Sequence, residues 1–135
     1  MSDAAKSSEV PPGKPAIKML MMPRDTNVHG TIFGGAILSH VDQAGAVHAR
    51  RHGCDRVVTV AVDRVEFTLP VYVGDVLCLH CRTLRVGRTS LTVEVDVWAD
   101  RFSPPYETIR VTEAQVTYVY VDEDGRPKPV PRPEP

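Results

Sequence analysis

The chain has 135 residues, which is enough for one domain with a modest hydrophobic core. Its 16 basic residues nearly balance its 17 acidic residues, so its charge offers little attraction for nucleic acid or an anionic membrane surface. No apolar run approaches the roughly 20 residues that span a bilayer, and the first residues lack the basic start and apolar stretch of a signal peptide. We therefore expect a cytoplasmic protein without membrane or nucleic-acid partners.

Proline is concentrated toward both ends of the chain. Alternating prolines cannot supply a sheet with N–H donors, and proline-rich segments favour extended conformations. We expect residues 1–15 to form a flexible arm and residues 128–135 to form an extended tail. The folded domain is predicted to span residues 16–127.

Between these ends the pattern is that of one helix and several strands. A short apolar strand is expected at residues 17–22, and helical composition follows over residues 36–52, ending at Gly53. Four extended segments come next, at residues 57–69, 76–86, 91–98 and 108–121. This order predicts an α+β fold in which a curved, mostly antiparallel sheet of five to six strands wraps around one long central helix. Order and length alone leave other α+β folds open.

Asp42 is the candidate catalytic residue of this helix. On a helical wheel it lies at the rim of the apolar arc, close to the small residues Gly45 and Ala46, which would let a ligand approach. The simpler interpretation is a boundary carboxylate that points to solvent. However, Gly34 and Gly35 leave the first helical N–H groups bare, and such groups suit a carbonyl oxygen that gains negative charge during a reaction. A tight turn before the helix would use the same glycines.

The spacing of these residues limits how they can cooperate. Gly34 and Asp42 are eight positions apart, which corresponds to about 12 Å along one helix axis. One chain therefore cannot easily bring both to the same carbonyl group. Two chains related by a two-fold axis, with antiparallel helices side by side, can do so. If the chain has an active site, we expect that site to be shared between subunits.

Several ordered motifs extend this interpretation. They are RDTNVHGTIFGG at residues 24–35, VDQAG at 41–45, RVVTV at 56–60, PVYVGDV at 70–76, GRTS at 87–90 and TEA at 112–114. Together they resemble the acyl-CoA thioesterases of the hotdog superfamily, of the bacterial YciA type. The resemblance covers about residues 16–127 and implies a hotdog fold that hydrolyses acyl-CoA to a carboxylic acid and CoA. It also implies a homodimer, commonly assembled into a hexamer as a trimer of dimers.

The resemblance implies roles for individual residues. Asp42 matches the catalytic acid, acting as a nucleophile or as a general base for water. Asn27 matches a polar residue that the opposite subunit contributes to hold the thioester or the water. Gly34, with Gly35 close by, matches the backbone donor to the thioester carbonyl. The CoA arm is expected to run near a hairpin formed by Arg88, Thr89 and Ser90. No cofactor is implied, because CoA is part of the substrate and product.

Two other functions share part of this pattern. A non-catalytic acyl-CoA-binding hotdog protein would bind CoA without releasing a thiol. A hotdog enoyl-CoA hydratase would use an Asp–His pair, which Asp25 and His29 superficially resemble. The proline of that motif is missing, and the spacing is one residue short. Cys78 and Cys81 form a CxxC pattern, but on a strand they would face opposite ways and no second pair accompanies them, so we expect no metal site.

Overall fold

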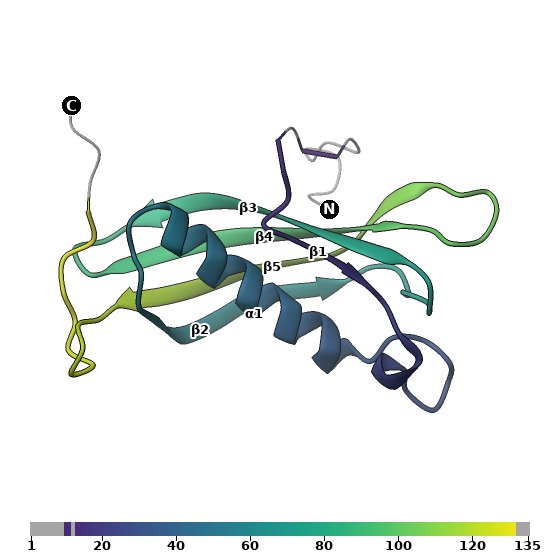
Figure 1. Ribbon diagram of the computed structural model, residues 1–135, viewed down its shortest axis with the longest axis horizontal. Helices are drawn as coiled ribbons and strands as arrows, with labels where there is room; N and C mark the ends of the chain where they lie inside the picture. The colour runs from purple at the N-terminus through teal and green to yellow at the C-terminus, as the bar shows by residue number, and fades with distance from the viewer. Residues whose placement is uncertain (1–9, 12, 132–135) are drawn as a thin grey trace.

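The computed structural model describes residues 10–11 and 13–131. Within these residues the fold consists of one α-helix, one short 3-10 helix and five strands (Figure 1), which are in chain order β1 (Ile17–Leu20), η2 (Pro23–Asp25), α1 (Gly34–Arg51), β2 (Val57–Phe67), β3 (Val76–Val86), β4 (Ser90–Asp100) and β5 (Thr108–Tyr120). The strands form one sheet in the order β1-β3-β4-β5-β2, and every neighbouring pair is antiparallel. The predicted α+β class is confirmed.

The hydrophobic core lies between α1 and the face of the sheet that it crosses (Figure 1). Because side chains alternate along a strand, every second residue of β4 points toward the helix. These residues are Leu91, Val93, Val95, Val97 and Ala99, and each is at most 2% exposed. The helix meets them with buried side chains that include Ile37, Val41 and Ala44. This packing fixes which face of α1 is left to form a site.

The helix begins two residues earlier than predicted, at Gly34. Its end agrees with the prediction to within one residue, because Gly53 adopts a positive φ of 90° and the N–H groups of His52 and Gly53 bond to carbonyls of the last helical turn. In the part of the chain that the structure describes, no helix is both long enough and apolar enough to cross a membrane.

The chain beyond β5 packs differently from the tail that we expected at residues 128–135. Val130 is buried in the core, and its N–H donates to the carbonyl of Arg88 at 2.8 Å. Lys128 likewise donates its N–H to the carbonyl of Tyr120. The alternation of proline with other residues explains the difference, since the residues between the prolines keep their donors and Val130 adds an apolar side chain. Residues 132–135, and residues 1–9 of the expected arm, lie outside the described residues.

Candidate active site

Asp42 lies in the middle of α1, on the side of the helix that faces β2. Its carboxylate oxygen Oδ1 accepts a hydrogen bond of 2.7 Å from the hydroxyl of Thr59 in β2. Its backbone carbonyl oxygen accepts a second bond of 2.7 Å from the hydroxyl of Tyr118 in β5. Thr59 and Tyr118 are direct partners across the two strands. Asp42 is therefore partly buried and held by the sheet, rather than being a boundary carboxylate that only points to solvent.

The two oxygens of the Asp42 carboxylate have different surroundings. Oδ1 is bonded to Thr59, whereas Oδ2 accepts no hydrogen bond from any residue in 10–11 or 13–131. An ionised carboxylate is an acceptor only, with roughly four lone-pair positions to satisfy. One oxygen is thus fixed in place while the other remains able to accept a proton from water or to attack a carbonyl carbon.

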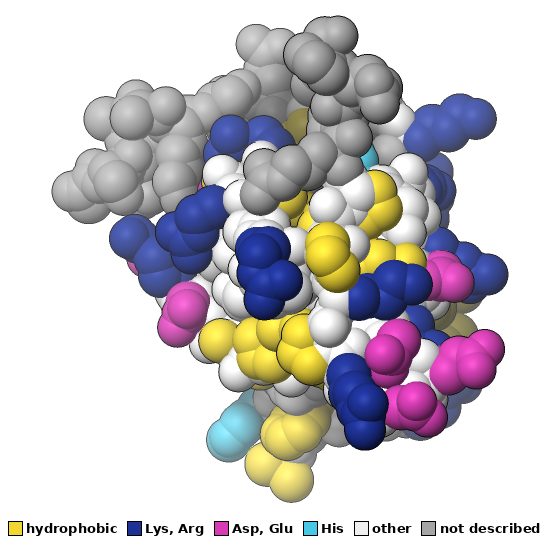
Figure 2. Space-filling view, turned by 90° about the vertical axis from the view of Figure 1, so that its left-hand side faces the viewer, with side chains coloured by type: hydrophobic (Ala, Val, Ile, Leu, Met, Phe, Trp, Pro, Cys, Tyr) yellow, Lys and Arg dark blue, Asp and Glu magenta, His cyan; other side chains and the backbone are white. Residues whose placement is uncertain are grey.

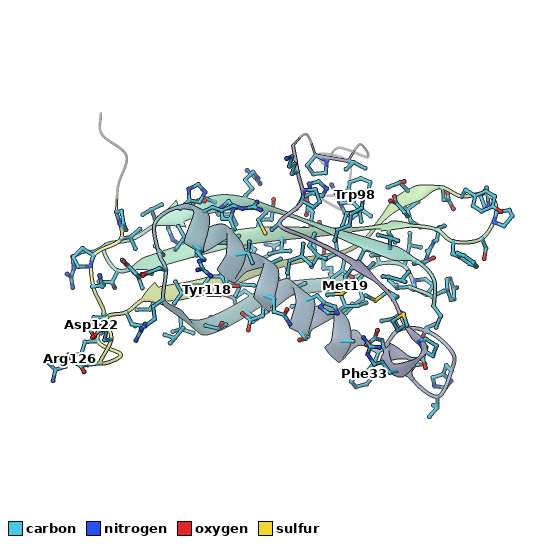
Figure 3. All side chains as sticks on the ribbon, viewed as in Figure 1. Met19, Phe33, Trp98, Tyr118, Asp122 and Arg126 are labelled. Carbon is cyan, nitrogen blue, oxygen red and sulfur yellow. The ribbon has the colours of Figure 1, made fainter. Side chains whose placement is uncertain are left out.

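Tyr118 is almost completely buried beneath the helix (Figure 3). Burial raises the pKa of its hydroxyl, and the nearby negative charge of Asp42 raises it further. Tyr118 is therefore a protonated donor throughout the physiological pH range. Its hydroxyl occupies the space where a Cβ atom would stand at Gly45, so any larger residue at that helix position would collide with it.

The start of α1 presents bare backbone donors. Phe33 occupies the N-cap position without a side-chain cap, and no residue in the described part of the chain accepts a hydrogen bond from the N–H groups of Gly34 or Gly35. The ring of Phe67 lies about 3.5 Å from where a Cβ of Gly34 would be, and the ring of Phe33 lies against Gly35 (Figure 3). Both rings are about half exposed. Donors at a positive helix end between two apolar rings suit the carbonyl group of an acyl chain.

Asn27 lies in the loop before the helix, and its side chain is used within that loop. Its Oδ1 accepts hydrogen bonds from the N–H groups of His29, at 2.8 Å, and Thr31, at 3.3 Å. Its Nδ2 donates to the hydroxyl of Thr31 at 2.9 Å. This is the bonding of a turn-forming asparagine. Within one chain, no hydrogen bond between described residues joins Asn27 to Asp42.

The Arg88–Ser90 hairpin lies at the opposite end of the molecule from Gly34. It follows β3 at the left of Figure 1, next to the C-terminal end of α1, and the helix is about 27 Å long. Its backbone is fixed on two sides, because the carbonyl of Thr89 accepts the N–H of Tyr120 and the carbonyl of Arg88 accepts that of Val130. Figure 2, which views this end, shows Lys and Arg side chains spread across it, with most of the Asp and Glu side chains at the right and fewer at the left.

One chain therefore does not assemble all the predicted site residues. Asp42 has partners, but Asn27, Gly34 and Gly35 lie toward one end of the helix and the Arg88–Ser90 hairpin lies at the other. Thr59 and Tyr118 were missed by the sequence analysis. Thr59 left one signal, as a hydroxyl residue within the valine-rich run at residues 57–60, whereas nothing in the sequence distinguished Tyr118.

The structure also bears on the hydratase alternative. The carboxylate of Asp25 accepts the N–H of Met22 at 3.0 Å, while His29 is exposed. No hydrogen bond links Asp25 to His29 in the residues that the structure describes. The acid–base pair that such a hydratase needs is thus not formed in this loop.

A single long helix held by a curved antiparallel sheet, with an acidic residue turned toward an edge strand, defines a hotdog-fold protein. A family model for the thioesterase superfamily matches residues 29–101. The acyl-CoA thioester hydrolase YciA of Salmonella typhimurium is 42% identical over 123 residues, which cover 90% of this chain and 92% of that protein. The chain belongs to the thioesterase superfamily.

Solved structures agree with this assignment. A hexameric hotdog fold thioesterase of Campylobacter jejuni has a TM-score of 0.84 and 45% identity, with 88% of this chain and 91% of that chain covered. An acyl-CoA hydrolase from Staphylococcus aureus, solved with butyryl coenzyme A and coenzyme A, has a TM-score of 0.77 and 31% identity, with 88% and 73% covered. The predicted hotdog fold is confirmed.

Proposed function

We propose that this protein is an acyl-CoA thioesterase that hydrolyses acyl-CoA to a free carboxylic acid and CoA, at sites shared between subunits. The observation that carries the proposal is the Asp42 carboxylate, one oxygen of which is held by Thr59 while the other is open. The relatives support this reaction, since YciA is an acyl-CoA thioester hydrolase and the S. aureus protein is an acyl-CoA hydrolase. The reaction needs no cofactor, because CoA belongs to the substrate and product.

The chemistry requires few groups. A thioester carbonyl is electrophilic and a thiolate leaves readily, so a carboxylate and oriented N–H donors suffice. Asp42 either removes a proton from the attacking water, or attacks the carbonyl itself and forms a mixed anhydride that water then hydrolyses. In both routes the carbon–sulfur bond breaks, and CoA leaves as a thiolate that takes up a proton. A positioned base contributes about 10²- to 10⁴-fold in rate. A donor to the oxyanion, here the N–H of Gly34 with that of Gly35 close by, contributes about 10²- to 10³-fold.

A pair of substitutions in a relative supports the Asp42–Thr59 pairing. The S. aureus enzyme was also solved as two variants, one with an aspartate and one with a threonine replaced by alanine. The two substituted positions are 17 residues apart, as Asp42 and Thr59 are. This shared spacing, together with the 2.7 Å hydrogen bond, favours a role for both residues in turnover.

The outer edge of β2 supports a homodimer as the smallest active unit. β2 is an edge strand of the sheet, and its side chains Val58, Val60 and Val62 are 44–56% exposed. A second copy that pairs along this edge would cover these valines and bring the two helices side by side. The donors of Gly34 and the side chain of Asn27 from one subunit would then approach Asp42 of the other. Several relatives are hexamers, and we propose a trimer of such dimers.

The CoA arm is assigned to the hairpin formed by Arg88, Thr89 and Ser90. Its guanidinium and hydroxyl groups suit phosphate oxygens, and the basic side chains at that end of the molecule (Figure 2) favour an anionic ligand. The net charge is near zero, which does not favour a nucleic-acid partner. We also propose that the enzyme works in the cytoplasm.

A thiol-release assay tests the proposed reaction. Purified protein should release thiol from acyl-CoA, and Asp42→Asn should lower turnover at least about 100-fold while CoA still binds. Glu107→Gln, which changes an exposed carboxylate between β4 and β5, is the control and should keep its turnover. Near-normal turnover of Asp42→Asn would remove Asp42 from the mechanism. Saturable CoA binding by the wild-type protein without any thiol release would instead identify a binding protein.

Subunit mixing tests whether the site is shared. Asp42→Ala and Asn27→Ala chains, each inactive alone, should regain part of the activity after subunit exchange, because one of the two sites in a mixed dimer keeps both residues. Verified mixed dimers without any recovery would show that the site is not shared in this way.

A further inference from the structure

We infer that Tyr118 is a positioning residue for Asp42, holding the helix backbone at Asp42 while Thr59, its partner across the sheet, holds the carboxylate. The inference rests on the proposed function, in which Asp42 carries the chemistry. Tyr118 is assigned no contact with the substrate.

The sheet holds Asp42 through two hydrogen bonds. Thr59 and Tyr118 occupy opposite positions on β2 and β5, and residues directly opposite each other project from the same face of a sheet. Both hydroxyls end at the same helical residue, each at 2.7 Å, one on the carboxylate oxygen and one on the main-chain carbonyl oxygen. Two contacts to different atoms of one residue limit both the distance of the helix from the sheet and its rotation about its own axis at that residue.

The helix sequence is adapted to the Tyr118 hydroxyl. A glycine inside a helix costs about 1 kcal/mol relative to alanine, yet Gly45 lies in the interior of α1. A Cβ atom at this position would collide with the hydroxyl and with the adjoining ring carbons of Tyr118. Gly45 is buried, so exposure to solvent does not explain why a glycine occupies this position. The glycine thus gives the hydroxyl its path to the Asp42 carbonyl.

The sheet is also irregular at this point. The pairing of β2 with β5 shifts between Thr59 and Ala61, so Val60 is an extra residue on β2. Bulges of this kind bend a strand and re-aim neighbouring side chains. The shift directly follows Thr59, so pairing remains regular from Val57 to Thr59 and changes beyond it. The bulge thus begins directly after the regular pairing that places Thr59 opposite Tyr118.

The test is Tyr118→Phe, which removes the hydroxyl and keeps the ring. We expect kcat for acyl-CoA hydrolysis to fall about tenfold, because small displacements of a catalytic group are costly, with KM changed less than about twofold. Tyr120→Phe is the matched control, since Tyr120 lies two residues further along β5 and its hydroxyl bonds to Asp55 at 3.2 Å, away from Asp42. Its kcat should stay at the wild-type value.

Parallel measurements separate the possible results. If Tyr118→Phe melts at a lower temperature but its folded fraction turns over at the wild-type rate, the hydroxyl is only structural and the inference is overturned. Equal kcat losses in Tyr118→Phe and Tyr120→Phe would overturn it as well. Gly45→Ala, which displaces the hydroxyl from the helix side, should reproduce the selective loss of kcat if Tyr118→Phe folds poorly. Asp42→Asn is measured alongside, because its activity decides the proposed function whatever Tyr118→Phe does.

Discussion

β2 and β4 are strands of equal length, eleven residues each, but their side chains have opposite surroundings. β4 lies in the middle of the sheet, and most of its residues are buried, whereas β2 forms an edge and has no buried residue. Both strands are rich in valine, so composition does not separate them. Position in the sheet determines burial, and the edge strand is the one that carries Thr59 to Asp42. The comparison indicates that β4 stabilises the fold while β2 serves the site.

The largest expected effect concerns the buried ion pair at the end of β4. Arg101 donates to the carboxylate of Asp75 at 2.6 Å, and the N–H groups of Tyr72 and Phe102 also donate to it. Asp75→Ala would leave the guanidinium buried without its partner, and we expect the free energy of unfolding, measured with urea, to fall by about 3–5 kcal/mol.

The control for this change is the ion pair of Arg82 with Glu94, whose arginine side chain is 69% exposed. Glu94→Ala should lower the free energy of unfolding by at most about 1 kcal/mol. Equal losses in Asp75→Ala and Glu94→Ala would contradict the expectation that the buried pair contributes more to stability than the exposed pair.

The second effect compares one valine from each strand. Val95 on β4 is fully buried, and Val95→Ala should lower the free energy of unfolding by about 2–3 kcal/mol, since two methyl groups and their packing are lost. Val60 on β2 is 56% exposed in one chain, and Val60→Ala should cost under about 0.5 kcal/mol in monomers. The free energy of unfolding of both variants is measured by denaturation at high and low protein concentration. A large cost for Val60→Ala at every concentration would show that this edge is covered within the single chain.

A third, smaller effect depends on pH. His48 on α1 contacts the hydroxyl of Thr83 on β3 at 2.8 Å. Its pKa is lowered to about 4, mainly by burial and also by the positive charges of His52 and Arg51. Protonation is therefore easier in the unfolded chain. The contribution of His48 to stability is complete above about pH 6.5 and is lost as the pH falls toward 4. We expect a loss of about 1–2 kcal/mol, because partial exposure weakens the effect.

Urea denaturation of the wild-type protein and of His48→Gln at pH 7 and pH 4.5 measures this contribution. The wild-type protein should lose more stability than the variant on acidification. An identical loss in both proteins would assign the acid sensitivity to other groups.

The smallest expected effect on stability accompanies a large effect on turnover. Thr59 is exposed, so Thr59→Val should change the free energy of unfolding by under about 0.5 kcal/mol. Its kcat should nevertheless fall about tenfold, because the carboxylate of Asp42 loses its fixed orientation. Thr92 on β4, which is buried and bonds to Thr117, offers the reverse case. Thr92→Val should cost about 1 kcal/mol and leave kcat unchanged. A kcat loss in Thr92→Val equal to that in Thr59→Val would end the division of roles between the two strands.

Local patterns predicted most of the fold. The helix end at Gly53 and the alternation of β4 follow from residues adjacent in the chain, and the position of Asp42 at the rim of the helix could be read in the same way. The partners of Asp42 could not, because Thr59 is 17 residues away and Tyr118 is 76 residues away. Val130 was misjudged for the same reason, since its burial depends on distant strands.

The pairing of Thr59 with Tyr118 has a consequence for how the chain must fold. Successive residues of a strand point to opposite faces, so a slip of β2 by one position along β5 would replace the hydroxyl below the carboxylate with the hydrocarbon of Val58 or Val60. Because β2 buries so little within one chain, a misaligned single chain would lose little packing energy and would resemble the correct one in compactness. A shifted register of β2 would therefore lower turnover more than the melting temperature. The register of this edge strand is constrained by catalysis more than by the core.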